Sequence, residues 1–586
     1  MLEEPRKYHW WSFLRDVLFF CVRLALISGI LATLRFYTAG YNLTLESLVL
    51  ITCSEVNIWK ENARRRRHYG SRSDIDIEKI GDTDLRSIEC VGTVVGYRED
   101  STTFRACLNS YRENYDNVMR VLVVGVDGNQ DEDLSMIEVA EEIFGDGLVK
   151  IELPRTFGAL AGDLIDQQCA ESLLALSKKG MIPQEHPKTP IDYGKVLSGL
   201  ILQASIILQE YDLQFPGSDR FHVICLNQPH NSKKEIMFTV FIFSLALCKS
   251  RNIPFIWSSD SDSWVFPSTI ARAISGIADD QSFGGSCTQL EIHNHTAAFI
   301  SYMAAATYWS EIHLTSGILS AFDAIDCIPG PCALFRREAL EDILLEWYDQ
   351  RIFGRRPTVN EDRHLTTRLL LNGWKISFSA QAIVATDAPA TFTAYTMQQL
   401  RWSRATILES TYYPLVYIRH SPVLFLASMR RLAVPIVCMY AICDFLWTGS
   451  SSYFSSVRDI FCRIILCAAY TYVRHRGRIS WFFIQLVAQP LWFILRAGFT
   501  IWSFPTIFDN SWGSFKTEDT IKFLSGSQLG TSVWLGLVHA AVCKYLAKSY
   551  MMQNEYCITI IGFLFKEGRI SAASAVLETE KNDTRF

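Results

Sequence analysis

The chain has 586 residues, more than one hydrophobic core usually organises, so at least two structural units are expected. Hydrophobic residues make up 49% of the chain and charged residues 20%, too apolar for an ordinary soluble enzyme and too charged for a pure membrane bundle. The formal net charge of -5 lacks the basic signature of nucleic-acid-binding proteins, so nucleic acid is excluded as a partner. The 16 cysteines contain no CxxC pair, which disfavours a zinc site or a disulfide framework.

Two segments near the N-terminus are apolar enough to interact with a membrane. Residues 17–34 approach the roughly 20 apolar residues that a spanning helix needs, and a weaker stretch follows at 44–59. The run Arg64–Arg67 comes next and indicates a cytosolic flank, because the cytosolic loops of membrane proteins are rich in Arg and Lys. A solvated charge run is the alternative interpretation. If both segments cross, Asn42 in the sequon Asn-Leu-Thr faces outward and is a candidate glycosylation site.

Between about 85 and 390 the sequence changes to the pattern of a soluble α/β domain. Short β-branched runs alternate with helical stretches such as 133–144 and 233–250, which predicts a doubly wound sheet of parallel strands. Ligands of such sheets bind at the carboxyl ends of the strands, where Asp127 and Asp260 stand in this sequence. The expected strands are 91–97, 120–127, 221–227 and 253–260.

Apolar character returns after residue 410. Ionisable side chains such as Arg431 and Arg496 lie in or beside these segments, and they are expected to face a bundle interior or a polar path. Because Pro490 and Arg496 divide the segment 480–506, we expect this segment to lie in the membrane interface. The segments are 421–447, 459–473, 480–506, 523–546 and 556–565.

Three short motifs carry residues suited to chemistry. Asp260-Ser-Asp262 ends a predicted strand, where two carboxylates can share one hard cation that bridges a diphosphate. Glu361-Asp362 opens a helical run; one carboxylate there could act as a general base, although acidic residues also favour helix N-termini for capping. Gln398-Gln-Leu-Arg401-Trp402 offers a guanidinium for phosphate and a flat ring for a sugar, although an Arg-Trp pair can also be a membrane anchor.

The order DxD, ED and QxxRW, followed by apolar segments, is more specific than any one motif. In this order the chain resembles the processive family 2 glycosyltransferases, which include the cellulose, chitin and hyaluronan synthases. The resemblance is closest to the hyaluronan synthase group and its fungal relatives, and it covers residues 88–410 approximately. Residues 511–514 (SWGS) are similar to the gating-loop motif of that group. The matching blocks are VVGYRED, VVGVDGN, NSKKEIMFTVF, DSDS, CIPGPCALFRREAL, EDRHLTTRLLLNGW and QQLRWSRA.

The resemblance implies a GT-A-type domain that takes a UDP-sugar donor and a growing polysaccharide acceptor. It implies that Asp260 and Asp262 hold Mg²⁺ or Mn²⁺ and that Asp362 is the catalytic base. Asp127 would contact the uridine, and either Lys233 or Lys234 the diphosphate. Which UDP-sugar is used stays open. The other implied substrate-binding residues are Gly330, Pro331, Cys332, Gln398, Arg401, Trp402 and Trp512.

The sequence therefore predicts a membrane-embedded, inverting, processive glycosyltransferase that makes and exports an extracellular or cell-wall polysaccharide. It would be a multi-pass protein of the plasma membrane with its catalytic domain in the cytosol. Two alternatives remain: a transferase of single sugars to a lipid carrier, and an inactive membrane transporter or scaffold. The expected parts are an N-terminal transmembrane region (1–62), a GT-A domain (85–390), interfacial helices with QxxRW (391–420), C-terminal transmembrane and interfacial helices (421–566) and a polar tail (567–586).

Overall fold

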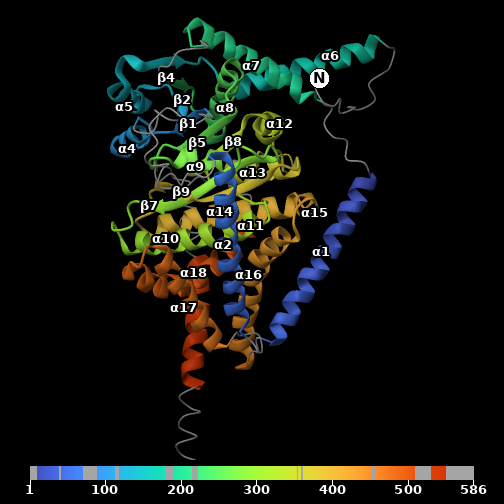
Figure 1. Ribbon diagram of the computed structural model, residues 1–586, viewed down its shortest axis with the longest axis vertical. Helices are drawn as coiled ribbons and strands as arrows, with labels where there is room; N and C mark the ends of the chain where they lie inside the picture. Colours follow the sequence, from blue (N-terminus) through green and yellow to red (C-terminus); the bar gives the residue numbers. More distant parts are fainter. Residues whose placement is uncertain are drawn as a thin grey trace, which may run out of the picture.

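The computed structural model shows an α/β domain joined to long apolar helices (Figure 1). The structure describes residues 10–37, 41–69, 89–112, 118–178, 191–213, 222–352, 354, 356–357, 360–450, 456–507 and 530–548.

A mixed sheet forms the centre of the α/β domain, with the strand order β3-β4-β2-β1-β5-β8-β7-β9-β6. β3, β4, β2, β1 and β5 pair in parallel, so their carboxyl ends meet at one edge of the sheet. β8 runs antiparallel to both β5 and β7, and β6 runs antiparallel to β9. The strands are β1 (Cys90–Gly96), β2 (Met119–Asp127), β3 (Leu148–Glu152), β4 (His222–Gln228), β5 (Phe255–Asp260), β6 (Ser263–Val265), β7 (Phe283–Ile292), β8 (Ala333–Arg336) and β9 (Lys375–Thr386).

Helices cover both faces of this sheet. Alternate residues of β2 show why: Val121 and Val123 belong to one apolar core, while Leu122 and Val124 belong to a second core on the opposite face. The first core includes α6 (Phe157–Lys178), α7 (Tyr193–Glu210), α8 (Lys233–Arg251), α12 (Arg337–Tyr348) and α13 (Glu361–Leu371). The second includes α4 (Ser101–Arg112), α5 (Ser135–Phe144) and α9 (Thr269–Ser275). Short η1 (Asp131–Asp133) and η2 (Gly145–Gly147) flank α5.

The four strands expected from sequence are present and parallel, and the doubly wound α/β arrangement is confirmed. β3 and β6–β9 were not expected. β6 and β8 are only three and four residues long, too short to give a periodic signal. β7 and β9 carry many polar residues, which weakens the apolar pattern of a buried strand. Side chains of neighbouring helices bond to the β9 backbone: Thr269 donates to the Ile383 carbonyl, and Ser320 accepts from the Phe378 N–H.

A third apolar cluster joins the α/β domain to the apolar helices. It includes residues of α10 (Phe299–Ser310), α14 (Phe392–Tyr412) and α18 (Ile479–Ser503). α10 continues through one π-helical segment, η3 (Glu311–Ser316), into α11 (Gly317–Ala321). α14 leads through α15 (Leu415–Arg419) into α16 (Pro422–Thr448), and α17 (Val457–Arg474) follows. This cluster places the QxxRW helix α14 directly between the sheet domain and α18.

Three described helices are long and apolar enough to cross a membrane: α1 (Trp10–Tyr37), α16 and α18. α18 is one continuous helix through Pro490, so the division that the sequence suggested there is absent. The weaker segment at 44–59 is part of a single helix, α2 (Asn42–Tyr69). Of the later segments, residues 530–548 are helical, and 556–565 lie outside the described residues, as does the expected tail.

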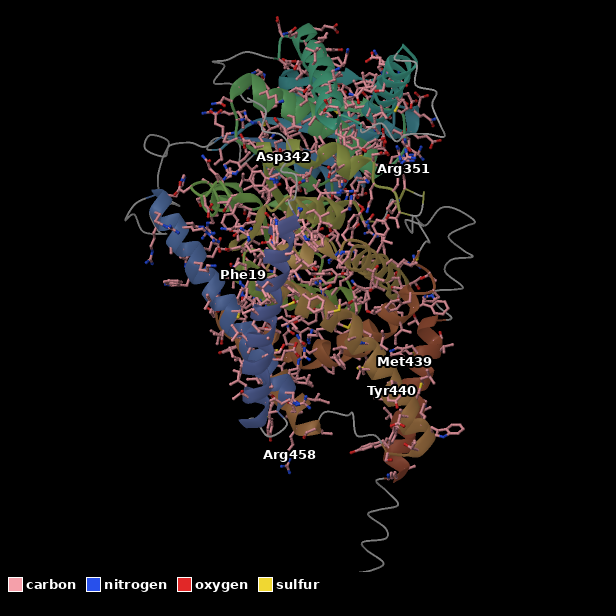
Figure 2. All side chains as sticks on the ribbon, turned by 90° about the vertical axis from the view of Figure 1, so that its right-hand side faces the viewer. Phe19, Asp342, Arg351, Met439, Tyr440 and Arg458 are labelled. Atoms are coloured by element: carbon pink, nitrogen blue, oxygen red, sulfur yellow. The ribbon has the colours of Figure 1, made fainter. Side chains whose placement is uncertain are left out.

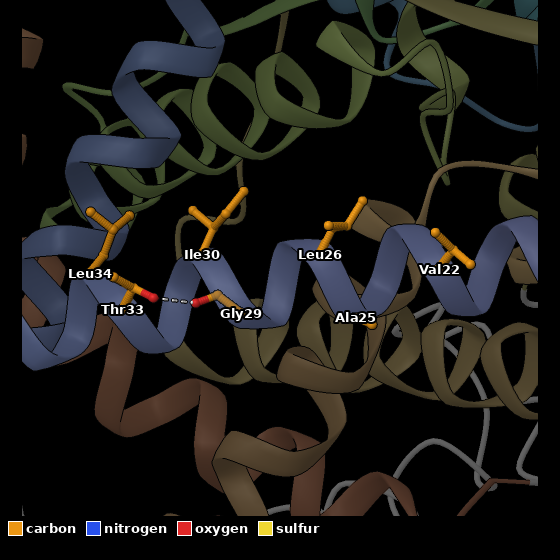
Figure 3. Close-up of a pocket in the computed structure, with 7 residues that line it drawn as sticks. All are labelled: Val22, Ala25, Leu26, Gly29, Ile30, Thr33 and Leu34. Atoms are coloured by element: carbon orange, nitrogen blue, oxygen red, sulfur yellow. Dashed lines mark hydrogen bonds between the residues drawn. The ribbon is translucent and has the colours of Figure 1, made fainter.

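Large apolar side chains on α1 and α16 are exposed, as a membrane environment would require. Phe19 on α1 and Tyr440 on α16 are 53% and 56% exposed, and Figure 2 shows Tyr440 far below Asp342 and Arg351 of the α/β domain. A hollow on α1 is lined by apolar and small side chains of that helix alone, with Thr33 bonded back to the Gly29 carbonyl (Figure 3). It holds no residue of the candidate site.

Helix α2 anchors this apolar part to the sheet (Figure 1). Glu61 and Arg65 form a buried ion pair, and Glu61 accepts a hydrogen bond from the backbone N–H of Ala380 at 3.1 Å. Arg65 also donates to Ser379 at 2.9 Å, and Arg64 donates to Ser377 at 2.9 Å. The arginine run is therefore used in part to hold α2 against β9, rather than lying free as a solvated charge run.

Candidate active site

The carboxyl ends of the parallel strands bring the predicted polar residues together. Asp127 ends β2 opposite Gln228 of β4, and Asp260 ends β5 opposite Val95 of β1. Five strands therefore aim their last residues at one edge, which is where ligands of doubly wound sheets bind. The strand registers confirm the expected position of Asp127 and Asp260.

Asp127 lies in a small polar pocket that sequence reasoning had only partly identified. Its carboxylate accepts from the Gln228 amide and from the Asn231 backbone N–H, both at 3.3 Å, and lies 2.9 Å from Nδ1 of His230. The His230 ring stacks on Tyr97 with ring centroids 4.0 Å apart. Burial raises the pKa of Asp127, although His230 opposes this. Tyr97 follows β1 directly, so its position after a strand end was the available signal for this aromatic surface.

Asp260 and Asp262 lie at the end of β5 and in the turn that follows it. Burial first, and then the charges of Asp260 and Glu99, raise the pKa of Asp262 to about 7. A hard divalent cation would offset this repulsion between neighbouring carboxylates. The described residues contain no ready cluster of three or more metal-ligating side chains, so a cation here would need further oxygen ligands, such as those of a diphosphate. The pair fits a metal ion of that kind.

Lys233 connects the DxD motif to the ED motif. Its Nζ lies 2.7 Å from Asp260 Oδ1 and 3.3 Å from Glu361 Oε1. Burial lowers the pKa of Lys233, but the two carboxylates outweigh it and hold this pKa above its usual range. A Cβ atom at Gly330 would come within 3.1 Å of the Asp260 carboxylate, so a residue without a side chain suits this approach.

The structure separates the two candidate lysines. Lys234 is buried, with its Nζ 5.2 Å from the centre of the Trp347 ring, and burial lowers its pKa to about 7. Adjacent residues on a helix point about 100° apart, which follows from 3.6 residues per turn. Lys233 is therefore the lysine that faces the strand ends.

Asp362 lies in the first turn of α13, where Glu361 is the first residue and Asn360 the N-cap. Asp362 is therefore not the capping residue, and the Asn360 side chain makes no cap hydrogen bond either, because it bonds to Glu409. Asp362 accepts from the Arg363 backbone N–H at 2.7 Å. Burial and then Glu361 raise the pKa of Asp362, while Lys233 and Arg363 act against them. A raised pKa suits a general base that works near neutral pH.

The QxxRW motif lies on α14. Gln398 accepts a hydrogen bond from Tyr308, and the Gln399 amide donates to the same Tyr308 oxygen at 2.9 Å. Trp402 packs beside Tyr308 with ring centroids 5.3 Å apart and stays 40% exposed, so part of the side chain is accessible. The positive charge of Arg401 acts to lower the pKa of Lys233, against the effect of the two carboxylates. Tyr308 is a site residue that no sequence motif had indicated.

A buried polar network lies behind the ED motif. Glu409, on the last turns of α14, accepts from Asn360 and from Gln350 and lies 3.1 Å from Nδ1 of His364. Arg368 donates to the other ring nitrogen of His364 at 3.2 Å. The network therefore locks the helix that carries Asp362 to the helix that carries QxxRW.

The remaining predicted site residues differ in their surroundings, and one of them lies outside the residues that the structure describes. The Cys332 side chain is fully buried and donates to the Thr288 carbonyl at 3.6 Å, and the place of this residue in an acceptor site stays a prediction. The Pro331 carbonyl accepts from Ser259, next to Asp260. Asn42 is the first residue of α2, and the Thr44 hydroxyl of its sequon donates to the Asp459 carboxylate. Trp512 lies outside the described residues.

Comparison with known families identifies the part of the chain that holds these motifs. Residues 215–405 match the family described as "Glycosyltransferase like family 2". Residues 215–405 are therefore similar to a family 2 glycosyltransferase domain. The matched residues include both carboxylate motifs, Lys233 and QxxRW, and Asp127 precedes them.

The similar proteins are hyaluronan synthases. The chain is 25% identical to hyaluronan synthase 2 of Xenopus laevis over 327 residues, which cover 56% of this chain and 52% of that protein. It is 24% identical to human hyaluronan synthase 2 over 329 residues, covering 56% of this chain and 51% of that protein. With hyaluronan synthase 3 of Xenopus laevis the identity is 24% over 457 residues, covering 77% of this chain and 73% of that protein. The chain thus spans about half the length of the first of these relatives.

Among solved structures, a mannosyltransferase from Pyrobaculum calidifontis in complex with GDP-Man and Mn²⁺ covers 76% of this chain and 99% of its own. Its sequence identity is 14% and its TM-score 0.35. The match of residues 215–405 and the similarity to hyaluronan synthases confirm the resemblance expected from the motifs.

Proposed function

We propose that this protein is a membrane-embedded, inverting, processive glycosyltransferase. It takes a UDP-sugar at the carboxyl edge of the sheet and extends a polysaccharide that leaves across the membrane. The family 2 domain, the resemblance to hyaluronan synthases and the adjoining apolar helices support this proposal. The observation that carries it is the convergence on Lys233 of Asp260 from the DxD motif and Glu361 from the ED motif.

The proposed chemistry is a single in-line displacement at the anomeric carbon of the donor. Asp362 removes the proton of the acceptor hydroxyl as the new bond forms, which a sugar hydroxyl needs because it is a weak nucleophile. Lys233 and Arg401 place positive charge where the UDP leaving group gains negative charge. One displacement inverts the anomeric centre, so an α-linked donor yields a β-linkage.

The donor is proposed to bind with Mg²⁺ or Mn²⁺ held by Asp260 and Asp262. Burial, together with the charges of Asp260 and Glu99, raises the pKa of Asp262 to about 7, and a cation at this position would offset both effects. When bound, the ion would neutralise charge on the diphosphate. Asp127, His230 and Tyr97 are placed to take the uridine, because the stacked rings offer a flat surface beside a carboxylate.

The acceptor is proposed to rest on Trp402. Its half-exposed indole offers a sugar ring an apolar face, and Tyr308 and Gln398 hold the neighbouring part of α14 in place. Gly330 and Pro331 lie between this surface and Asp260 in the proposed arrangement. The polymer would then pass between the apolar helices that follow α14.

The chain is proposed to be a multi-pass protein of the plasma membrane. Residues 85–390 would form the cytosolic domain, 1–62 and 421–566 the membrane regions, 391–420 the interfacial helices and 567–586 a polar tail. The three candidate spans support a membrane protein. Trp512 and Asn42 remain proposed as a substrate-contacting residue and a glycosylation site.

The test is to reconstitute the purified protein in lipid and to supply single UDP-sugars and pairs of them. We expect UDP release and a polymer that a linkage-specific glycosidase digests. Sugar found only on an extracted lipid carrier would support the single-sugar transferase instead. If no UDP-sugar gave any UDP release, the enzymatic proposal would be wrong.

A further inference from the structure

The segment 326–328, which lies shortly before Gly330, contacts the N-terminal half of α13. Asp326 accepts from Nη1 of Arg363 at 2.8 Å, and the Cys327 thiol lies 3.8 Å from Asp362 Oδ2. The backbone N–H of Ile328 donates to the Thr366 hydroxyl at 2.8 Å. The proposed base therefore lies on a turn whose position depends on this segment.

Asp326 is also tied to the membrane region. Arg431 of α16 forms an ion pair with Asp326, and it reaches the same oxygen, Oδ2, that Arg363 binds. The side chains of Asp326 and Arg431 are only 17% and 11% exposed. Burial would raise the pKa of Asp326, but Arg431 and Arg363 hold it well below its usual range. The carboxylate therefore stays charged at any working pH and bridges α16 to α13.

The residue next to Arg431 shows that this contact is specific. Arg430 pairs with Glu46 of α2, so its ion pair stays among the apolar helices and does not reach the α/β domain. Arg430 and Arg431 carry the same charge and lie on the same helix, but they bind different carboxylates. Arg430 is therefore a matched control for Arg431.

We propose that Asp326 and Arg431 are positioning residues for sugar transfer, which hold the helix of Asp362 in register with membrane helix α16. This inference rests on the proposed role of Asp362 as the base. Neither residue touches the strand-end carboxylates in the described contacts, so the pair acts on the donor site only through α13. A base displaced by about 1 Å can lose a hundredfold in rate, so such a bridge matters most for the transfer step.

The bridge also affects the charge around the base. The groups that face Asp362 are Glu361, Lys233, Arg363 and Cys327. Burial and Glu361 raise the pKa of Asp362, and Arg363 lowers it while being partly neutralised by Asp326. Asp326→Asn would leave the charge of Arg363 unbalanced, so the pKa of Asp362 should fall. Because the base acts in its deprotonated form, the acid limb of the pH–rate profile should move to lower pH.

The experiment measures UDP release in lipid for Asp326→Asn, Arg431→Gln, the double variant, Arg431→Lys and the control Arg430→Gln. We expect each of the first two to lower kcat about tenfold or more, with the donor KM changed by less than about twofold. The double variant should be no slower than the slower single variant, because both changes break one bridge. Arg431→Lys should recover much of the rate, and Arg430→Gln should stay near wild type.

Asp362→Asn in the same assay separates this inference from the proposed function. If Asp362→Asn is inactive and both Arg431→Gln and Asp326→Asn turn over like wild type, the positioning role is wrong and the base stands. If Asp362→Asn is active, the proposed base is wrong. Should Asp326→Asn fail to fold, Arg431→Gln decides, since it leaves the Asp326–Arg363 pair intact. Equal losses in Arg430→Gln and Arg431→Gln would also overturn the proposal.

Discussion

The two adjacent lysines show that the fold places chemically identical side chains in different surroundings. Lys233 and Lys234 are neighbours with the same side chain, yet one binds Asp260 and Glu361 and the other packs on Trp347. The sequence identified both lysines as candidates for binding the diphosphate. It could not show which of them lies in the site, because that depends on which face of α8 meets the strand ends. Tyr308 was missed for a similar reason, since it contacts QxxRW only through the packing of α10 on α14.

The crowded carboxylates predict a requirement for a divalent cation. Burial and then the charges of Asp260 and Glu99 disfavour the charged form of Asp262 beside the place proposed for a diphosphate, so donor turnover should stop when EDTA removes free metal. The measurement is UDP release before chelation, after it, and after Mg²⁺ or Mn²⁺ is added back. Turnover that continues unchanged in EDTA would exclude the metal.

The partial exposure of the Trp402 side chain predicts that replacing this residue stops elongation of the polymer. Trp402→Ala should reduce polymer by about tenfold or more while the protein remains folded, because the acceptor ring loses its stacking surface. Polymer per folded molecule is the measurement. Trp447→Ala is the control, since Trp447 on α16 is 90% exposed and its side chain is distant in sequence from the QxxRW motif. Equal effects of the two changes would point to membrane anchoring rather than acceptor binding.

At the level of elements, periodic apolar strands were predictable and helix α2 was not. β1, β2, β4 and β5 are buried on both faces, so each gives a continuous β-branched run. α2 was expected as an apolar segment followed by a charged flank. Instead Asn57, Glu61 and Arg65, spaced four apart, lie on one face of a single helix and bind β9. The four-residue spacing is visible in the sequence, but the sequence does not show that these side chains bind β9.

This docking predicts a large effect of a small change in α2. Glu61→Gln leaves Arg65 without its charged partner in a buried setting, which costs on the order of 3–5 kcal/mol. The measurement is the midpoint of thermal unfolding in lipid or detergent. Lys60→Gln is the control, because the side chains of its pair with Asp323 are 33% and 28% exposed. If both variants unfolded at the same temperature, α2 would not depend on the buried pair.

The whole molecule combines a soluble α/β domain with an apolar helical part, as its composition indicated. Length and hydropathy were sufficient to predict that division, and the motif order was sufficient to predict the resemblance to family 2 glycosyltransferases. What sequence could not supply is how the parts join. The buried cluster of α10, α14 and α18, the anchor of α2 and the Asp326–Arg431 pair are all contacts between distant segments.

The orientation of the whole protein is testable with protease. UDP-sugars are proposed to be taken from the cytosol, so protease added outside intact cells should leave 85–390 uncut. Permeabilised cells provide the control, in which the same region should be cleaved. Cleavage in that region without permeabilisation would reverse the proposed topology.

The central claim is that Asp362 removes the proton of the acceptor hydroxyl. Asp362→Asn keeps nearly the same shape at the second position of α13, where Asn360 remains the N-cap, but an amide does not accept the proton. Asp342→Asn is the control: Asp342 is an exposed carboxylate on α12 that accepts a hydrogen bond from Trp374, in the part of the domain labelled in Figure 2.

The decisive measurement is the rate of UDP release and polymer formation by Asp362→Asn in lipid, together with its binding of UDP in the presence of metal. We predict a normally folded protein that binds UDP and loses about a hundred- to ten-thousand-fold in rate. Glu361→Gln should be milder, and Asp342→Asn should stay near wild type. If Asp362→Asn kept more than about a tenth of the wild-type rate, which is well above what loss of a general base allows, the account would be contradicted.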